Sequence, residues 1–120
     1  MSADLYERAL AISERAYAPY SNFHVGAAVR ARDGRIFEGV NVENAAYPLG
    51  ICAERTALAV AVVEGYKPGD LEEIAITAPP CGGCRQWIHE FRLERVTFKN
   101  DAGELVTRTP AELLPETFEL

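Results

Sequence analysis

The sequence is poor in cysteine, in histidine and in long apolar stretches. It contains three cysteines and two histidines, and no apolar run approaches the roughly 20 residues that are needed to cross a bilayer. Three cysteines without an evident pairing agree with a reducing compartment. The acidic, helix-like N-terminal segment does not look like a secretory signal. We therefore expect a cytoplasmic protein without a membrane partner.

Positive charge is also scarce. Twelve Lys and Arg residues stand against eighteen Asp and Glu residues, so the formal net charge is −6 at pH 7. Proteins that bind polynucleotides usually carry a basic stripe that neutralises phosphates. Here Asp33 interrupts the cluster formed by Arg30, Arg32 and Arg35. The charge pattern argues against a nucleic-acid partner and leaves a small, uncharged substrate open.

The remaining composition is typical of a globular protein. Hydrophobic residues make up 48% of the chain and charged residues 25%. The length suits one folding unit, so we expect a single domain over residues 1–120. The sequence has neither an internal repeat nor a low-complexity segment.

Hydrophobic periodicity and turn residues predict an alternation of helices and strands. We expect helices over residues 4–17 and 52–64, after Pro80 and after Thr109, and strands over residues 25–30, 36–40, 71–77, 96–99 and 105–109. Asp33-Gly34 predicts a hairpin between the first two strands. The connection around residues 100–103 is too short for a parallel crossover, so the last two strands should be antiparallel. The order indicates a mixed five-stranded sheet with helices on both faces.

Two further expectations concern the helices. The segment 52–64 is apolar nearly all round and is expected to be buried between layers, with Gly65 as its stop. Trp87, on the helix after Pro80, is expected in the core. Thr109 to Glu112 has the pattern of a capping box with proline at the first helical position.

All three cysteines fall into two short motifs, Cys-Ala-Glu-Arg at residues 52–55 and Pro-Cys-Gly-Gly-Cys at residues 80–84. Three thiolates can hold a zinc ion and leave its fourth tetrahedral position open, as in catalytic zinc sites. Both motifs begin predicted helices, where backbone N–H groups and the helix dipole favour thiolate. Glu54 stands within reach of the open position. Arg55 is expected to offset the negative charge by donating to sulfur, the alternative being a surface ion pair.

Cysteine ligands with a nearby glutamate that is not a ligand are the signature of nucleobase deaminases. Two further segments accompany them, Pro-Tyr-Ser-x-Phe-x-Val-Gly-Ala-Ala at residues 19–28 and Asn-Val-Glu-Asn-Ala-Ala-Tyr at residues 41–47. With these motifs the chain closely resembles the cytidine deaminase family, in its small homotetrameric branch, from Tyr17 to Phe118. The resemblance implies a three-layer α/β/α sandwich around the mixed five-stranded sheet.

The resemblance also implies roles for individual residues. Cys52, Cys81 and Cys84 would bind one zinc ion, and Glu54 would shuttle protons. The implied substrate-binding residues are Phe23 beside the pyrimidine, Asn41 and Glu43 at the ribose hydroxyl groups, and Ala45, Tyr47 and Phe118 in the pocket of a neighbouring subunit. The alternatives are that Phe23 is a core aromatic residue and that Asn41 is a turn residue.

The implied reaction is the hydrolytic deamination of cytidine and deoxycytidine to uridine and deoxyuridine, with release of ammonia, as in pyrimidine salvage. Zinc lowers the pKa of bound water to about 7 and so supplies a nucleophile. Glu54 would take up the released proton, pass one to ring N3 and later protonate the departing amine.

Two alternatives stay open at this point. One is deamination of another aminopyrimidine nucleoside, such as an antibiotic of the blasticidin type, although Asn-x-Glu-Asn at residues 41–44 favours a ribose. The other is a non-catalytic zinc module, in which His24 or His89 closes the metal site. The connection at residues 76–81 is shorter than is usual in the family, which predicts a more open base pocket.

Overall fold

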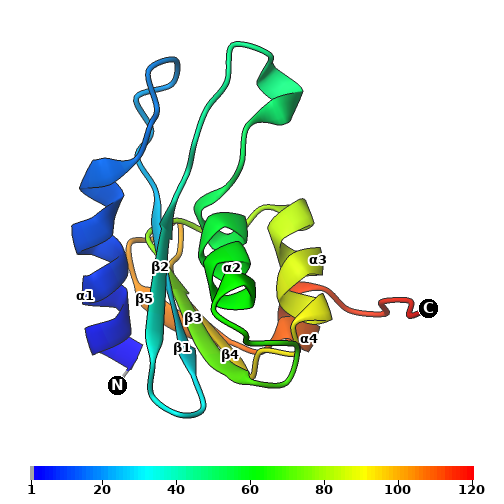
Figure 1. Ribbon diagram of the computed structural model, residues 1–120. Helices are drawn as coiled ribbons and strands as arrows, with labels where there is room; N and C mark the ends of the chain where they lie inside the picture. The colour runs from blue at the N-terminus through cyan, green and yellow to red at the C-terminus, as the bar shows by residue number, and fades with distance from the viewer. Residues whose placement is uncertain (1) are drawn as a thin grey trace.

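A mixed five-stranded sheet lies at the centre of the structure, a computed structural model that describes residues 2–120 (Figure 1). The strands are β1 (Gly26–Ala31), β2 (Ile36–Val40), β3 (Leu71–Ile76), β4 (Arg95–Lys99) and β5 (Leu105–Arg108). Their order across the sheet is β2-β1-β3-β4-β5. β3 and β4 pair in parallel, whereas the other neighbours pair antiparallel, which confirms the orientation predicted for the last two strands.

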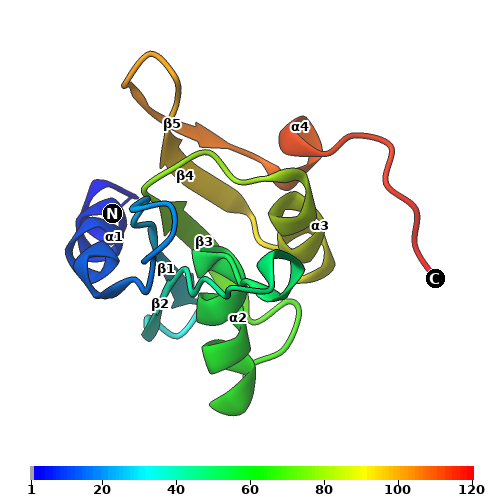
Figure 2. The same ribbon diagram turned by 90° about the horizontal axis from the view of Figure 1, so that it is seen from above.

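Helices cover both faces of this sheet (Figures 1 and 2). The α-helices are α1 (Ser2–Ile12), α2 (Ala53–Val63), α3 (Gly82–Glu90) and α4 (Pro110–Leu113), and two short 3₁₀ helices are η1 (Ser13–Arg15) and η2 (Tyr47–Leu49). α1 packs on one face, while α2 and α3 lie on the other. The predicted three-layer α/β/α sandwich is thereby confirmed.

The alternation of side chains along β3 supplies a core on each face, because successive strand residues point in opposite directions. Ile74 and Ile76 belong to the larger core beneath α2 and α3, whereas Ala75 belongs to the smaller core beneath α1. Both isoleucines and the alanine are fully buried. A strand with apolar residues on both faces is typical of the middle of a covered sheet, and β3 is the central strand.

Gly39 in β2 allows α2 to lie directly on the sheet. A Cβ atom at this position would come within 2.3 Å of the backbone nitrogen of Ala57 and within 2.6 Å of the carbonyl oxygen of Ala53. Both atoms belong to the backbone of α2, so a side chain here would displace the helix. Because α2 begins at Ala53, the close approach also fixes the position of the first turn that carries Glu54.

The predicted first helix is too long. α1 ends at Ile12 instead of residue 17, and the chain continues as the 3₁₀ helix η1. The hydroxyl group of Ser13 donates to the carbonyl oxygen of Leu10 at 2.6 Å, a local hydrogen bond of the kind that competes with the α-helical pattern. Hydrophobic periodicity does not show where a side-chain hydrogen bond of this kind ends a helix, so it did not predict the end of α1.

The expectation that α2 is buried all round is wrong. Leu58 is fully buried against the sheet, but Val62 is 48% exposed and Val63 is 81% exposed. Within residues 2–120, no element covers this outer side of the helix. Trp87 is likewise not a core residue, since it is 36% exposed and stacks on Phe91 with ring centroids 6.1 Å apart.

Other local predictions are confirmed. The β1–β2 hairpin turns at Gly34, whose φ of 95° suits glycine. Gly65 follows α2 with a φ of 98°. The capping box is complete, because the Thr109 side chain accepts from the Glu112 backbone and the Glu112 side chain accepts from the Thr109 backbone. Across residues 2–120, no helix combines the length and hydrophobicity that crossing a membrane requires.

Candidate functional site

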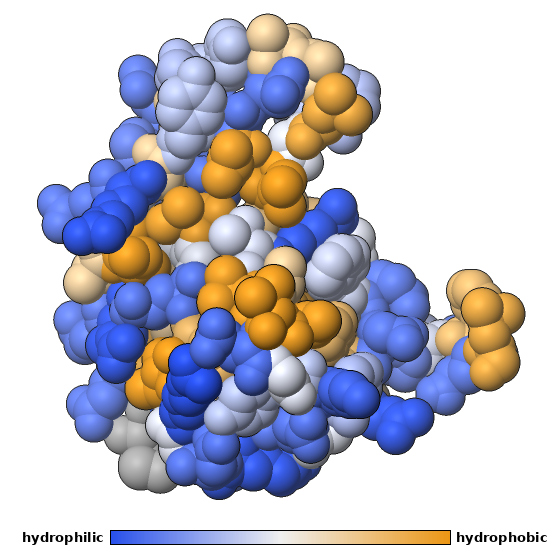
Figure 3. Space-filling view, viewed as in Figure 1, coloured by the Kyte–Doolittle hydropathy of each residue, from blue (hydrophilic) through white to orange (hydrophobic). Residues whose placement is uncertain are grey.

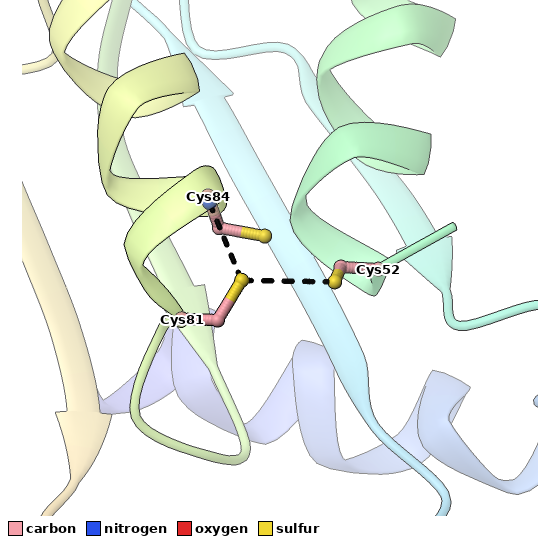
Figure 4. Close-up of side chains that lie close together, drawn as sticks. All are labelled: Cys52, Cys81 and Cys84. Carbon is pink, nitrogen blue, oxygen red and sulfur yellow. Dashed lines mark hydrogen bonds between the residues drawn. The ribbon is translucent and has the colours of Figure 1, made fainter. Parts of the chain in front are cut away.

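Two helix N-termini bring the three cysteines together (Figure 4). Cys52 is the N-cap residue of α2, Cys81 is the N-cap residue of α3, and Cys84 lies in the first turn of α3. Their sulfur atoms all lie within 4.8 Å of one another, and the Cys52 and Cys81 sulfurs are 3.9 Å apart. In residues 2–120, no other group of three His, Cys, Asp or Glu side chains gathers its ligand atoms so closely.

This donor set fits zinc. A zinc–thiolate bond of about 2.3 Å in a tetrahedral site places neighbouring sulfurs about 3.8 Å apart, close to the Cys52–Cys81 distance. The backbone N–H of Cys84 donates to the Cys81 sulfur at 3.4 Å. His24 is exposed on a loop and His89 lies 3.9 Å from Glu119, so neither imidazole joins the sulfurs. The geometry gives three protein ligands and leaves a fourth position for solvent or substrate.

The thiols share their charge unequally. The pKa of Cys52 is lowered to about 6, because the Cys84 thiol donates a hydrogen bond to its sulfur and because the Cys81 thiol and the Arg55 charge add to this. The pKa of Cys84 is raised, since its thiol proton is held by Cys52 and since burial disfavours a further charge there. Cys52 therefore carries negative charge at neutral pH, which favours a bound cation.

Glu54 lies in the first turn of α2 and is 4% exposed. Burial raises its pKa to about 7, and the negative charge of Cys52 adds to this effect. A carboxyl group that gains and loses a proton near neutral pH is suited to general acid–base chemistry. The side chain also lines the cavity that opens onto the cysteines.

That cavity has a volume of about 490 Å³, which is within the range of small-molecule sites. Residues of two loops line it, one before β1 and one between β2 and α2. Figure 1 shows both loops rising above the sheet. Figure 3 shows the molecule hollowed between these loops and the helices below, with apolar side chains along the rim. The wall combines aromatic, amide and carboxylate groups.

The model of a family described as "Cytidine and deoxycytidylate deaminase zinc-binding region" matches residues 2–100 of the chain. The chain belongs to the cytidine deaminase family. A cytidine deaminase from Halalkalibacterium halodurans is 43% identical over 122 residues, which cover 95% of this chain and 91% of the relative. A probable cytidine deaminase from Dictyostelium discoideum is 46% identical over 106 residues, which cover 76% and 71% of the two chains.

Solved structures agree with this membership. The crystal structure of cytidine deaminase from Burkholderia pseudomallei has a TM-score of 0.91 and 44% identity, and the match covers 98% of this chain and 99% of that one. The cytidine deaminase from Mycobacterium tuberculosis has a TM-score of 0.85 and 34% identity, covering 98% and 97%. These structures share both the fold and much of the sequence with the present cytidine deaminase family member.

Four of the six residues predicted to bind substrate in this family member line the cavity of their own chain. They are Phe23, Asn41, Glu43 and Tyr47. Phe23 is 61% exposed, so the alternative of a core aromatic residue is wrong. Ala45 and Phe118 are exposed and lie outside this wall, and the C-terminal tail that carries Phe118 extends away from the sheet (Figure 2). Their contribution to a neighbouring chain stays a prediction.

Asn41 fits both explanations considered for it, a turn residue and a substrate-binding residue. Its side-chain oxygen accepts from the backbone N–H of Val25 at 2.8 Å, and its side-chain nitrogen donates to the carbonyl oxygen of Phe23 at 2.8 Å. The amide therefore braces the loop before β1, as a turn residue does. It also faces the cavity, where one N–H and one oxygen lone pair are free of these two bonds.

Arg55 lies between α2 and α3, and its guanidinium is 5.9 Å from the centroid of the Trp87 ring. It occupies space that the absence of a side chain at Gly83 provides, since a Cβ atom there would be 2.2 Å from Nη2. Burial acts to lower the pKa of Arg55, but the neighbouring thiols, Cys84 foremost, raise it overall. The arginine takes no part in the ion pairs found within residues 2–120, so the alternative of a surface ion pair is wrong. Its donation to sulfur stays a prediction.

Two residues without a sequence-based assignment hold the cysteine-bearing turns. Arg85 donates to the carbonyl oxygens of Pro80 at 2.9 Å and of Leu113 at 3.1 Å, which ties the start of α3 to the end of α4. The Thr56 hydroxyl group lies 2.9 Å from the carbonyl oxygen of Val40, which ties α2 to the end of β2. Both residues stand next to a cysteine motif, which could have drawn attention to them. Their partners are distant in sequence, so the contacts themselves could not be predicted.

Proposed function

We propose that the chain is a hydrolase that deaminates cytidine and deoxycytidine to uridine and deoxyuridine, releasing ammonia, with one zinc ion per chain. The observation that carries the proposal is a group of three cysteine sulfurs, without an imidazole among them, of which Cys52 and Cys81 line the same cavity as the buried Glu54. A site closed for structure alone has four protein ligands. Membership in the cytidine deaminase family supports the choice of substrate.

Cys52, Cys81 and Cys84 would hold the zinc ion, which when bound supplies a nucleophile by lowering the pKa of water. Glu54 moves the protons. Its buried carboxylate takes one proton from the attacking water and delivers it to ring N3. It then takes the second proton from the new hydroxyl group at C4 and passes it to the amino group, which leaves as ammonia while the C4 carbonyl forms. Water and the nucleoside are thereby converted to the uracil nucleoside and ammonia. A positioned group of this kind typically contributes about 10²–10⁴-fold to the rate.

The cavity wall favours a nucleoside over a nucleotide. Phe23 offers apolar surface to a flat base, while Asn41 and Glu43 offer polar groups to sugar hydroxyls. Arg55 is the cationic residue among the described lining residues, and it is engaged with the thiols. A phosphate group would enter a wall that carries the carboxylates of Glu43 and Glu54 and no second cation among the described lining residues.

This proposal predicts a clear order of substrates. The purified protein, with its zinc content measured, should convert cytidine and deoxycytidine. Cytosine and cytidine monophosphate should react at least about tenfold more slowly, because cytosine has no sugar to contact the cavity wall and the monophosphate brings a negative charge to it. Ultraviolet absorbance follows the reaction directly. Protein carrying one zinc ion per chain that converts neither nucleoside would disprove the function.

We also propose that four copies of this single domain, residues 1–120, assemble into a homotetramer whose subunits complete each other's pockets through Ala45, Tyr47 and Phe118. Apolar surface supports an interface, because large exposed apolar patches mark contact sites. Val60, Val62 and Val63 are exposed on the outer side of α2, and Figure 3 shows apolar side chains gathered over this helix. Three cysteines outside disulfides support a reducing, cytoplasmic location. Membership in the cytidine deaminase family supports a role in pyrimidine salvage.

If neighbouring subunits complete the pockets, specific activity should fall when the protein is diluted below the concentration at which it assembles. Light scattering would give the mass at each concentration, and initial rates would be measured in the same samples. An inert carrier protein at constant concentration controls for adsorption to surfaces. A monomer whose specific activity is independent of concentration contradicts the shared pocket.

A further inference from the structure

The hydroxyl group of Ser21 joins two loops that overhang the cavity. It donates to Oε2 of Glu43, and it accepts the backbone N–H of Phe23 at 3.0 Å. The backbone N–H groups of Tyr20 and Ser21 donate to the other carboxylate oxygen, at 2.9 and 3.1 Å. Ser21 itself lines the cavity.

The same network continues to Asn41, whose side chain donates to the carbonyl oxygen of Phe23. Three residues proposed to bind substrate are therefore connected in the order Glu43, Phe23, Asn41, and Ser21 provides the link between the first two. Asn22 turns the chain beside this link with a φ of 59°, a left-handed conformation that asparagine tolerates better than most residues.

The backbone of these loops is held separately. The N–H of Tyr17 donates to the carbonyl oxygen of Asn41 at 3.1 Å, and the N–H of Glu43 donates to the carbonyl oxygen of Tyr17 at 2.8 Å. These bonds do not involve the Ser21 side chain. Loss of its hydroxyl group should therefore free Oε2 of Glu43, while Oε1 keeps its two backbone donors and the loops keep their paths.

Glu43 has little acceptor capacity to spare. An ionised carboxylate offers about four acceptor positions, and three are taken by Tyr20, by the Ser21 N–H and by the Ser21 hydroxyl. The hydrogen bond from the Ser21 hydroxyl is the main cause that lowers the pKa of Glu43, so the group is ionised and accepts hydrogen bonds only. The remaining position suits a hydroxyl donor in the cavity.

We propose that Ser21 is a positioning residue for recognition of the sugar: its hydroxyl group orients the Glu43 carboxylate, relative to Phe23, to accept a hydrogen bond from a secondary hydroxyl of the ribose. This inference rests on the proposed nucleoside deaminase function. Ser21 acts through Glu43 and does not need to touch the reacting atoms.

Ser21→Ala and Ser21→Thr test this role with cytidine and with 2′,3′-dideoxycytidine, which lacks both secondary hydroxyls. For cytidine, Ser21→Ala should lower kcat/KM about tenfold or more, the scale of one hydrogen bond to a charged group. For the dideoxynucleoside, the same variant should stay within about twofold of the parent, because no hydroxyl meets Glu43. Ser21→Thr keeps a hydroxyl group and should restore most of the cytidine activity.

An equal loss for both substrates, or an unchanged kcat/KM for cytidine, would overturn the proposal. So would loss of zinc or of the circular dichroism spectrum in Ser21→Ala, since either would indicate a structural role. Calorimetric titration with uridine and with 2′,3′-dideoxyuridine supplies a readout that is independent of turnover, and Ser21→Ala should weaken uridine binding alone. A parent protein that binds uridine but does not convert cytidine would refute the proposed function. The role of Ser21 would then be tested by calorimetric titration of the parent and of Ser21→Ala with the two uracil nucleosides.

Discussion

Glu54→Gln should deaminate cytidine at least about 100-fold more slowly than the parent protein, while its fold and its zinc content stay unchanged. Glutamine has nearly the same shape as glutamate, but its amide can neither take up nor deliver a proton at neutral pH. The side chain is 4% exposed in the first turn of α2, where burial already raises the pKa of the native carboxyl group to about 7. A neutral amide removes the cost of a buried charge, so no loss of stability is expected.

Absorbance measurements with cytidine would give the rate, and atomic absorption would give the zinc content of the same preparation. Glu64→Gln is a matched control, because Glu64 follows the last turn of the same helix and pairs with Arg35 at the surface. The control should keep the parental rate. Turnover by Glu54→Gln at the parental rate would end the assignment of Glu54 as the proton shuttle.

Cys84→Ser should lose zinc and stability together. Cys84 is fully buried beneath the other two cysteines, and a serine hydroxyl is a much weaker ligand for zinc than a thiolate. Metal that binds the folded chain stabilises it, by about 4 kcal/mol when zinc is present at about 1,000 times its Kd. The substitution removes this stabilisation, so the free energy of unfolding should fall by about 4 kcal/mol.

Urea unfolding with and without a chelator separates the two contributions. The chelator should destabilise the parent protein by an amount close to the effect of Cys84→Ser, and it should have little further effect on the variant. Zinc analysis should give about one ion per chain for the parent and little for the variant. A variant that keeps its full zinc content would show that Cys84 is not a ligand.

Local signals predicted the local structure well. β2 spans Ile36–Val40 as expected, because a hairpin turn precedes this short β-prone run and a loop that contains asparagine and proline follows it. The capping box at Thr109 was equally predictable, since its partners lie three residues apart. The outer face of α2 was not predictable in this way. An apolar helix surface is covered or exposed according to which elements pack on it, and Val63 stays exposed within the described chain.

The amino-acid sequence by itself determined the ligand types, the position of Glu54 two residues after Cys52, and the family, because these depend on residue identity and short spacings. Only the tertiary structure decided that Cys52 and Cys81, 29 residues apart, have sulfurs 3.9 Å from each other. It also decided that Ser21 holds Glu43 across 22 residues. Such contacts arise where strand pairing and helix packing bring distant segments together, and no local propensity encodes which segments meet.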